Sequence, residues 1–155
     1  MEKTNFEDLF NKIKNDESLA SELDIDELLS LVEDGNYFEN KTLNDIINTN
    51  IEVIKSLDIP KEEINNYLSK LAGYRYIDDL YQLNRGRFIR WFDKNNQLKN
   101  GAIVSELLFN NNGTSVLCKN ANHRYFQINF DNNTIFQKLS NDEELLLMAY
   151  EFSKK

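Results

Sequence analysis

The hydrophobic residues in the first half of the chain recur at the spacing of amphipathic helices. The clearest helix is predicted after Thr42, which we expect to act as its N-cap. Its apolar stripe consists of Leu43, Ile46, Ile47, Ile51 and Ile54. Two shorter acidic helices are predicted before it, and the first begins with a capping box of Thr4 and Glu7. The second is capped by Asp24 and stopped by Gly35.

Two further helices are predicted before the pattern changes. The first begins near Pro60, because proline is tolerated in a first helical turn, and ends near Gly73. The second runs from Tyr74 to about Asn84 and is stopped by Gly86. Its apolar face consists of Ile77, Leu80 and Tyr81.

After Gly86 the hydrophobic residues follow the alternation of β-strands. Strands are predicted at residues 87–92, 101–109, 114–119, 124–130 and 134–139. The Asn112–Gly113 pair is a strong hairpin signal, because both residues tolerate a positive φ. The short turns predict an antiparallel meander that closes into a small barrel or lays one face on a helix.

Alternation also predicts which residues share a face of the sheet. In the second strand one face carries Ile103, Leu107 and Phe109. The fourth strand is expected to point Phe126, Ile128 and Phe130 inward.

A last helix closes the chain after a capping box of Ser140 and Glu143. We expect it to cover one end or face of the sheet with Leu145, Leu146, Met148, Ala149 and Phe152. The fold class is therefore α+β: N-terminal acidic helices, a four- to five-stranded antiparallel meander or small barrel, and a C-terminal helix. We divide the chain into an acidic helical region, 1–73, and a region, 74–155, that contains a linking helix, the sheet and the closing helix.

Charge is distributed unevenly along the chain, whose net charge is −8. Residues 1–73 carry 7 lysines against 17 acidic residues, whereas residues 74–139 carry 9 basic against 5 acidic residues. Two interpretations stay open. Either the acidic half neutralises the basic half within the fold, or each half presents its charge to a partner.

Four of the five arginines and the only tryptophan lie between Tyr74 and Phe92. Guanidinium groups bind phosphates bidentately and aromatic rings stack on bases, so a small sheet with both suits single-stranded nucleic acid. The candidate binding residues, for a nucleic acid or an acidic partner, are Arg85, Arg87, Arg90, Trp91, Lys119 and Arg124.

Alternation in the first strand places its arginines on both faces of the sheet, which argues against a single basic face. One face carries Arg87, Ile89 and Trp91. The other carries Phe88, Arg90 and Phe92. Whichever face is core must shelter an arginine, and the alternative interpretation is that the aromatic residues are core while the arginines pair with acidic residues.

No group of residues in the sequence indicates catalysis. Cys118 and His123 lack the third group that a nucleophilic pair needs, and two residues are too few for a zinc site. The glycines are isolated turn residues rather than a phosphate-binding loop. We therefore expect no enzyme activity, no catalytic residue, no metal and no cofactor.

The single cysteine excludes an internal disulfide, and the N-terminus lacks the apolar segment of a signal peptide. No apolar run approaches the roughly 18 residues of a membrane span. We expect an intracellular, cytoplasmic protein that does not associate with membranes.

Several short motifs carry a resemblance to a known group of proteins. They are Tyr-Ile-Asp-Asp-Leu-Tyr from Tyr76, Gly-Arg-Phe-Ile-Arg-Trp from Gly86 and Asn-Gly-Ala-Ile-Val from Asn100. With Phe-Gln-Ile-Asn-Phe from Phe126 and Ile-Phe-Gln-Lys-Leu-Ser from Ile135, the second half resembles uncharacterised proteins of large nucleocytoplasmic DNA viruses. The resemblance implies a viral protein of the host cytoplasm or virion, and it implies no activity or site residue.

Charge asymmetry without a catalytic group favours a non-enzymatic protein-interaction module, with its oligomeric state open. The alternative is binding of single-stranded nucleic acid, RNA in particular, through the basic β half.

Overall fold

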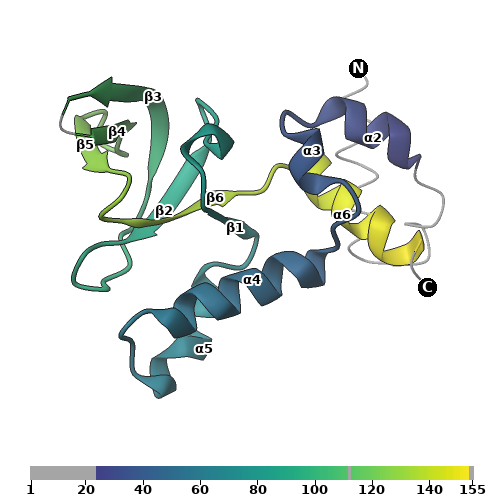
Figure 1. The fold of residues 1–155 in the computed structure, drawn as a ribbon, viewed down its shortest axis with the longest axis horizontal. Helices are drawn as coiled ribbons and strands as arrows, with labels where there is room; N and C mark the ends of the chain where they lie inside the picture. Colours follow the sequence, from purple (N-terminus) through teal and green to yellow (C-terminus); the bar gives the residue numbers. More distant parts are fainter. Residues whose placement is uncertain (1–23, 112, 154–155) are drawn as a thin grey trace. The chain divides into compact units, whose positions relative to one another are not determined.

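The computed structural model describes residues 24–111 and 113–153, which form an α+β fold (Figure 1). The described helices are α2 (Ile25–Leu31), α3 (Gly35–Phe38), α4 (Leu43–Ser56), α5 (Lys61–Lys70), η2 (Leu80–Gln82, a 3-10 helix) and α6 (Asn141–Ser153). The strands are β1 (Tyr74–Ile77), β2 (Phe88–Phe92), β3 (Ala102–Asn110), β4 (Gly113–Lys119), β5 (Tyr125–Asn129) and β6 (Thr134–Lys138). The predicted capping box of Thr4 and Glu7 lies outside the described residues.

The chain forms two compact units, and the first is built from both ends of the described chain. It contains residues 24–46 together with 139–153, whereas the second unit is continuous from 47 to 138. This grouping differs from the predicted division at residue 73. The C-terminal helix was expected to cover the sheet, but its buried residues pack with those of α2 and α3.

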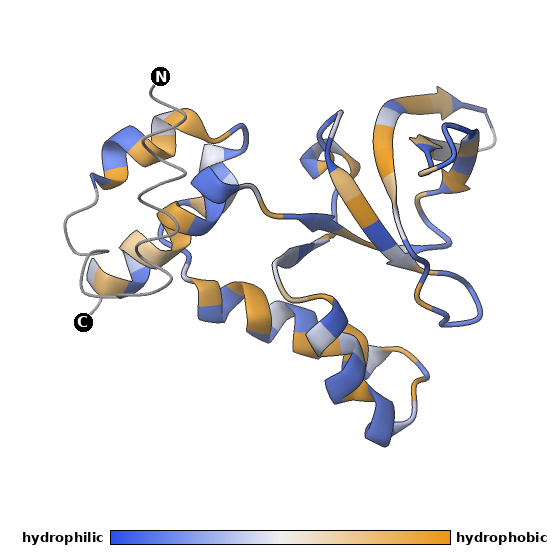
Figure 2. Cartoon of the chain, turned by 180° about the vertical axis from the view of Figure 1, so that it is seen from behind, coloured by the Kyte–Doolittle hydropathy of each residue, from blue (hydrophilic) through white to orange (hydrophobic). Residues whose placement is uncertain are grey.

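A helical core holds the first unit together. It buries Leu28 and Phe38 together with the leucines of α6, a helix that carries both hydrophobic and hydrophilic residues in Figure 2. The predicted Ser140 box is confirmed: Ser140 N donates to Glu143 Oε1 at 2.8 Å, and Glu143 N donates to Ser140 Oγ at 3.1 Å. Gly35 does not stop the second helix as predicted. Helix α2 already ends at Leu31, and Gly35 instead begins α3, with Asp34 as the N-cap.

The second unit is organised around one open antiparallel sheet with the strand order β1-β6-β2-β3-β4-β5. Strands β2 to β5 form the predicted meander, and β6 then returns to lie between β1 and β2. The sheet therefore has six strands rather than four or five. It has two edges, β1 and β5, rather than the closed circle of a barrel.

The additional strand, β1, occupies a segment that the sequence pattern predicted as helix, and that prediction is wrong. Tyr74–Ile77 pairs with β6, and its residues alternate between the two faces of the sheet. Aromatic and β-branched residues favour this half-buried pleated setting. Only η2, capped by the side chain of Asp79, keeps helical backbone in the segment.

The sheet curls, so that one face encloses its own core. Trp91 on β2 and Phe126 on β5 are separated by two strands, yet their ring centroids are 5.8 Å apart. We call this cluster the inner core. It contains Ile77, Leu80, Leu83, Ile89, Trp91, Ala102, Val104, Val116, Cys118, Ile128 and Ile135. The prediction that Phe126, Ile128 and Phe130 point inward is confirmed, since all three side chains pack in or against the inner core.

A register shift in β3 overturns the predicted faces of that strand. The pairing with β4 slips between Val104 and Glu106, and a bulge of this kind bends the strand. Val104 and Leu107 consequently both pack on the inner core, although strict alternation would separate them. Ile103 and Phe109 are exposed.

The opposite face of β1, β6 and β2 is covered by α4 and α5. This helix-covered core buries Ile54, Leu71, Phe92 and Phe136. Since β2 has a core on each face, Ile89 and Phe92 are both buried. The sequence pattern suggested that only one face of this strand is core, but both faces pack against a core.

The side chain of Asn50 on α4 closes the β1 edge. Its Nδ2 donates to Tyr74 O at 2.9 Å, and its Oδ1 accepts from Tyr76 N at 3.2 Å. The amide thus satisfies one acceptor and one donor of the edge strand, as a further strand would. Asn50 is buried, so both hydrogen bonds are shielded from water.

Candidate binding surface

Four side chains form a continuous line across the outer face of β2, β3, β4 and β5. Phe88 pairs with Ile103, Ile103 with Lys119, and Lys119 with Tyr125. Directly opposed residues in a sheet share a face and lie about 5 Å apart, so the four side chains are neighbours. We call them the exposed row. Phe88, Ile103 and Tyr125 are 36%, 44% and 59% exposed.

Local geometry fixes the two aromatic ends of the exposed row. The ring of Phe88 lies against the backbone of Gly101: a Cβ on that glycine would meet the ring at 2.6 Å. At the other end, Lys119 Nζ lies 5.7 Å from the centroid of the Tyr125 ring, within cation–π range. The exposed row therefore combines apolar area with a positive charge held beside an aromatic face.

Three of the residues predicted as a binding site are engaged elsewhere. Trp91 is only 6% exposed and belongs to the inner core. Arg87 Nη2 donates to Lys138 O at 2.6 Å. Arg90 Nε donates to Lys99 O at 3.1 Å, and its Nη1 donates to Lys70 O at 3.4 Å. These side chains fasten β2 to neighbouring segments.

The other three predicted residues lie nearer the surface. Arg85 Nη2 lies 3.7 Å from Glu106 Oε1, and both side chains are exposed. Lys119 belongs to the exposed row, and Arg124 directly precedes Tyr125. The structure thus places Lys119 in the exposed row and Arg124 next to Tyr125 along the chain, and it does not gather all six predicted residues into one patch.

Sequence reasoning missed Phe88, Ile103 and Tyr125 as surface residues. Each follows alternation on the side opposite a buried neighbour: Ile103 precedes Val104, and Tyr125 precedes Phe126. Alternation therefore contained a signal for each strand. Their alignment into one line depends on the pairing register, which the bulge in β3 changes further along that strand.

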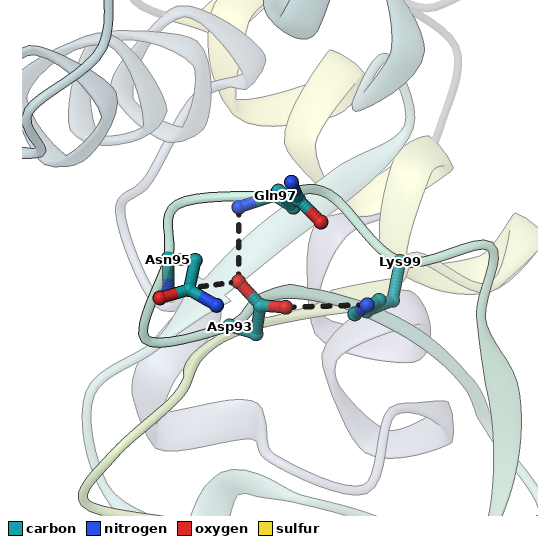
Figure 3. Close-up of polar contacts among 4 residues, drawn as sticks. All are labelled: Asp93, Asn95, Gln97 and Lys99. Carbon is teal, nitrogen blue, oxygen red and sulfur yellow. Dashed lines mark hydrogen bonds and ion pairs between the residues drawn. The ribbon is translucent and has the colours of Figure 1, made fainter.

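Asp93 and Lys99 form an ion pair within the loop between β2 and β3 (Figure 3). Asp93 Oδ1 accepts from the N–H groups of Asn95 at 2.9 Å and Gln97 at 3.1 Å, and Lys99 Nζ lies 3.2 Å from Asp93 Oδ2. The Gln97 N–H, followed by Lys99 and the Asn95 N–H, lowers the pKa of Asp93. Its contribution to stability is therefore present above its ordinary pKa of 3.8 and is lost in stronger acid. The loop is a structural element.

A buried polar cluster fastens the segment between β1 and β2 to the sheet. Arg75 is fully buried, and its Nη2 donates to Gln82 O at 3.1 Å. Gln137, opposite Arg75 on β6, accepts from Asn84 N through its Oε1 at 2.9 Å. These contacts involve backbone groups of the segment, so the cluster serves the fold rather than an external ligand.

Cys118 is buried, and His123 lies exposed in a turn with a φ of 61°. Burial raises the pKa of the Cys118 thiol from 9.0 to about 11. The thiolate is the reactive form of cysteine, so this environment suppresses its chemistry.

We predict that native Cys118 is alkylated by iodoacetamide at pH 8.5 at least about 50-fold more slowly than in the urea-unfolded chain, because a raised pKa removes thiolate. Intact mass measured over time gives both rates. Similar rates would contradict the burial of the thiol.

Since the folded pKa of Cys118 exceeds the ordinary value, the thiol's contribution to stability is complete below pH 9.0 and declines as the pH approaches about 11.

Within residues 24–111 and 113–153, no three His, Cys, Asp or Glu side chains lie close enough together to hold a metal ion. None of the helices in that part of the chain is long and apolar enough to cross a membrane. Comparison with models of known families, with curated proteins and with solved structures finds no match.

Proposed function

We propose that this protein is a non-enzymatic protein-interaction module and that the exposed row is its docking surface. The supporting observation is that three of its four side chains are large and hydrophobic, yet they lie exposed on one face of a sheet. Contiguous exposed hydrophobic side chains are typical of interaction sites, whereas scattered ones are not.

The charges around the exposed row favour an acidic protein segment as the partner. Lys119 lies within the row and Arg124 next to Tyr125 along the chain, and neither forms an ion pair with a described residue. Residues 47–138 carry 12 basic and 9 acidic residues, a net charge of +3. A segment with apolar side chains between acidic ones complements both features. From the resemblance to viral proteins we further propose that the partner is a protein of the host cytoplasm or of the virion.

Single-stranded nucleic acid is the second candidate, favoured by the rings of Phe88 and Tyr125 beside a lysine. Nucleic-acid interfaces commonly neutralise about 6–10 phosphates. The guanidinium groups of Arg87 and Arg90 already bind backbone carbonyls, and Arg85 lies near Glu106. Few cations therefore remain for phosphates, and the protein partner is the better supported candidate.

The test uses displayed random 12-residue peptides selected for binding to the full chain. We expect the selected peptides to alternate acidic with large apolar residues, and Tyr125→Ala and Ile103→Ser to weaken their binding at least about 10-fold, the loss typical of central interface residues. Fluorescence polarisation measures the affinity. The matched control is Tyr81→Ala, because Tyr81 is, among the described residues, the most exposed aromatic, at 79%, and lies outside the exposed row.

Two results would overturn the proposal. One is peptide binding that Tyr125→Ala and Ile103→Ser leave unchanged. The other is tight binding of labelled oligouridine or oligodeoxythymidine that weakens steeply with salt and is lost in Lys119→Ala and Arg124→Ala variants. The second result would establish the nucleic-acid candidate.

A further inference from the structure

The two edge strands of the sheet differ in the side chains that bond to their outward backbone groups. Asn50 closes β1, whereas β5 has a strand on one side only. Strand β5 also lacks the proline, the charged side chains and the bulge that often block an edge. Residues 125–129 contain neither proline nor a charged side chain, and the register between β4 and β5 runs without a shift.

The hydrogen bonds of β5 show which of its backbone groups point outward. Phe130 N donates to Thr114 O, and Asn120 N donates to Arg124 O, each at 3.0 Å. Because alternate residues of an antiparallel ladder face the neighbouring strand, the even-numbered residues of β5 bond to β4. The N–H and C=O groups of Tyr125, Gln127 and Asn129 therefore point away from the sheet.

We propose that β5 pairs with β5 of a second copy of this chain, antiparallel and centred on Gln127, to form a symmetric dimer. Gln127 would lie opposite Gln127 of the second copy, and Tyr125 opposite Asn129. All three residues have outward-facing backbone groups, but Asn129 O already accepts from Asn133 Nδ2 at 2.6 Å. This register therefore forms two hydrogen bonds at the Gln127 pair and one, from Asn129 N–H to Tyr125 O, at each outer pair. A two-fold interface of this kind uses the same surface on both copies and is closed.

The charges at the ends of β5 are complementary to those of a second, antiparallel copy. Arg124 precedes the strand, Asp131 follows it, and both side chains are exposed. Neither forms an ion pair with any residue that the structure describes. In the proposed register Arg124 lies opposite Phe130 of the second copy, one position from that copy's Asp131. The attraction occurs twice, once at each end of the interface, whereas a parallel copy would bring like charges together.

The dimer does not depend on the docking role of the exposed row. It would nevertheless double that surface, because opposed residues in an antiparallel pair share a face. Both copies would present their exposed rows on the same side of one continuous sheet.

The backbone test compares two substitutions at the centre of the interface. Sedimentation equilibrium of the full chain at about 100 μM, well above the dissociation constants of ordinary specific interfaces, is expected to show a dimer. Gln127→Pro removes the outward N–H and spares the bonds to β4, so it should give a folded monomer. Gln127→Ala keeps that N–H and should remain a dimer. Circular dichroism and a thermal melt report whether each variant is folded.

The charge test works even where the proline variant fails to fold. Arg124→Glu and Asp131→Lys should each raise the dimer dissociation constant about 10-fold or more, because each places like charges at both ends of the interface. The double variant exchanges the signs and should restore the wild-type constant to within about threefold. A monomeric wild-type chain, a dimer that survives Gln127→Pro, or charge reversals without mutual rescue would overturn the proposal.

Discussion

Replacing Gly101 with alanine is expected to lower the unfolding free energy by about 3–5 kcal/mol, the sum of backbone strain and overpacking. The backbone at Gly101 has a φ of +109°, which side-chain-bearing residues rarely adopt. The added Cβ would also lie 2.8 Å from Ile89 O and 2.6 Å from the Phe88 ring. A backbone carbonyl of β2 moves only with its strand, so the overlap is not relieved cheaply.

Gly86→Ala is the matched control for this prediction. Gly86 has a φ of +80°, but nothing lies within 4 Å of the Cβ position. Its substitution should therefore cost only the left-handed strain of about 1–2 kcal/mol. Urea unfolding of both variants gives the two free energies. Equal losses would show that the contact between Gly101 and Phe88 does not hold the end of the exposed row.

Asn50→Ala should lower the unfolding free energy by about 2–4 kcal/mol, because it leaves one backbone donor and one backbone acceptor of half-buried residues unbonded. The groups are Tyr76 N and Tyr74 O, which bond to the Asn50 amide. Hydrogen exchange provides a local readout, since the Tyr76 amide should exchange faster in the variant than in the wild type. Asn50→Asp should also destabilise, because a carboxylate cannot donate to Tyr74 O.

Asn48→Ala is the control for helix propensity, since Asn48 lies on the same helix and is exposed. Its effect should stay within about 0.5 kcal/mol, as for most surface substitutions. If Asn50→Ala were equally mild, the amide could not be what closes the β1 edge.

Local signals in the sequence predicted much of the fold. Strand β4 was expected at 114–119 and occurs at Gly113–Lys119, because apolar alternation and the preceding Asn-Gly turn act over a few residues. The capping box of Ser140 and Glu143 is equally local. Strand β1 was missed because its partner is β6: Tyr76 pairs with Phe136, sixty positions later, and nothing near Tyr76 records that pairing.

The candidate site was predictable only in part. Lys119 and Arg124 were expected at a surface and lie there. Trp91 carried the strongest chemical signal among the candidates, but it packs against Phe126 across the curled sheet. Aromatic residues on alternating strands look alike in a sequence whether they are core or surface. The curl of the sheet and the helices on one of its faces decide between the two, and both depend on distant contacts.

Because the first unit joins residues 24–46 to residues 139–153, it has consequences for synthesis on the ribosome. Leu28 and Phe38 emerge long before α6, whose leucines bury them. The inserted unit, in contrast, has all its strands once Lys138 has been translated. The nascent chain is therefore expected to complete its sheet first and its terminal helices last. The folded insert then replaces a long flexible loop, whose closure would otherwise cost conformational entropy.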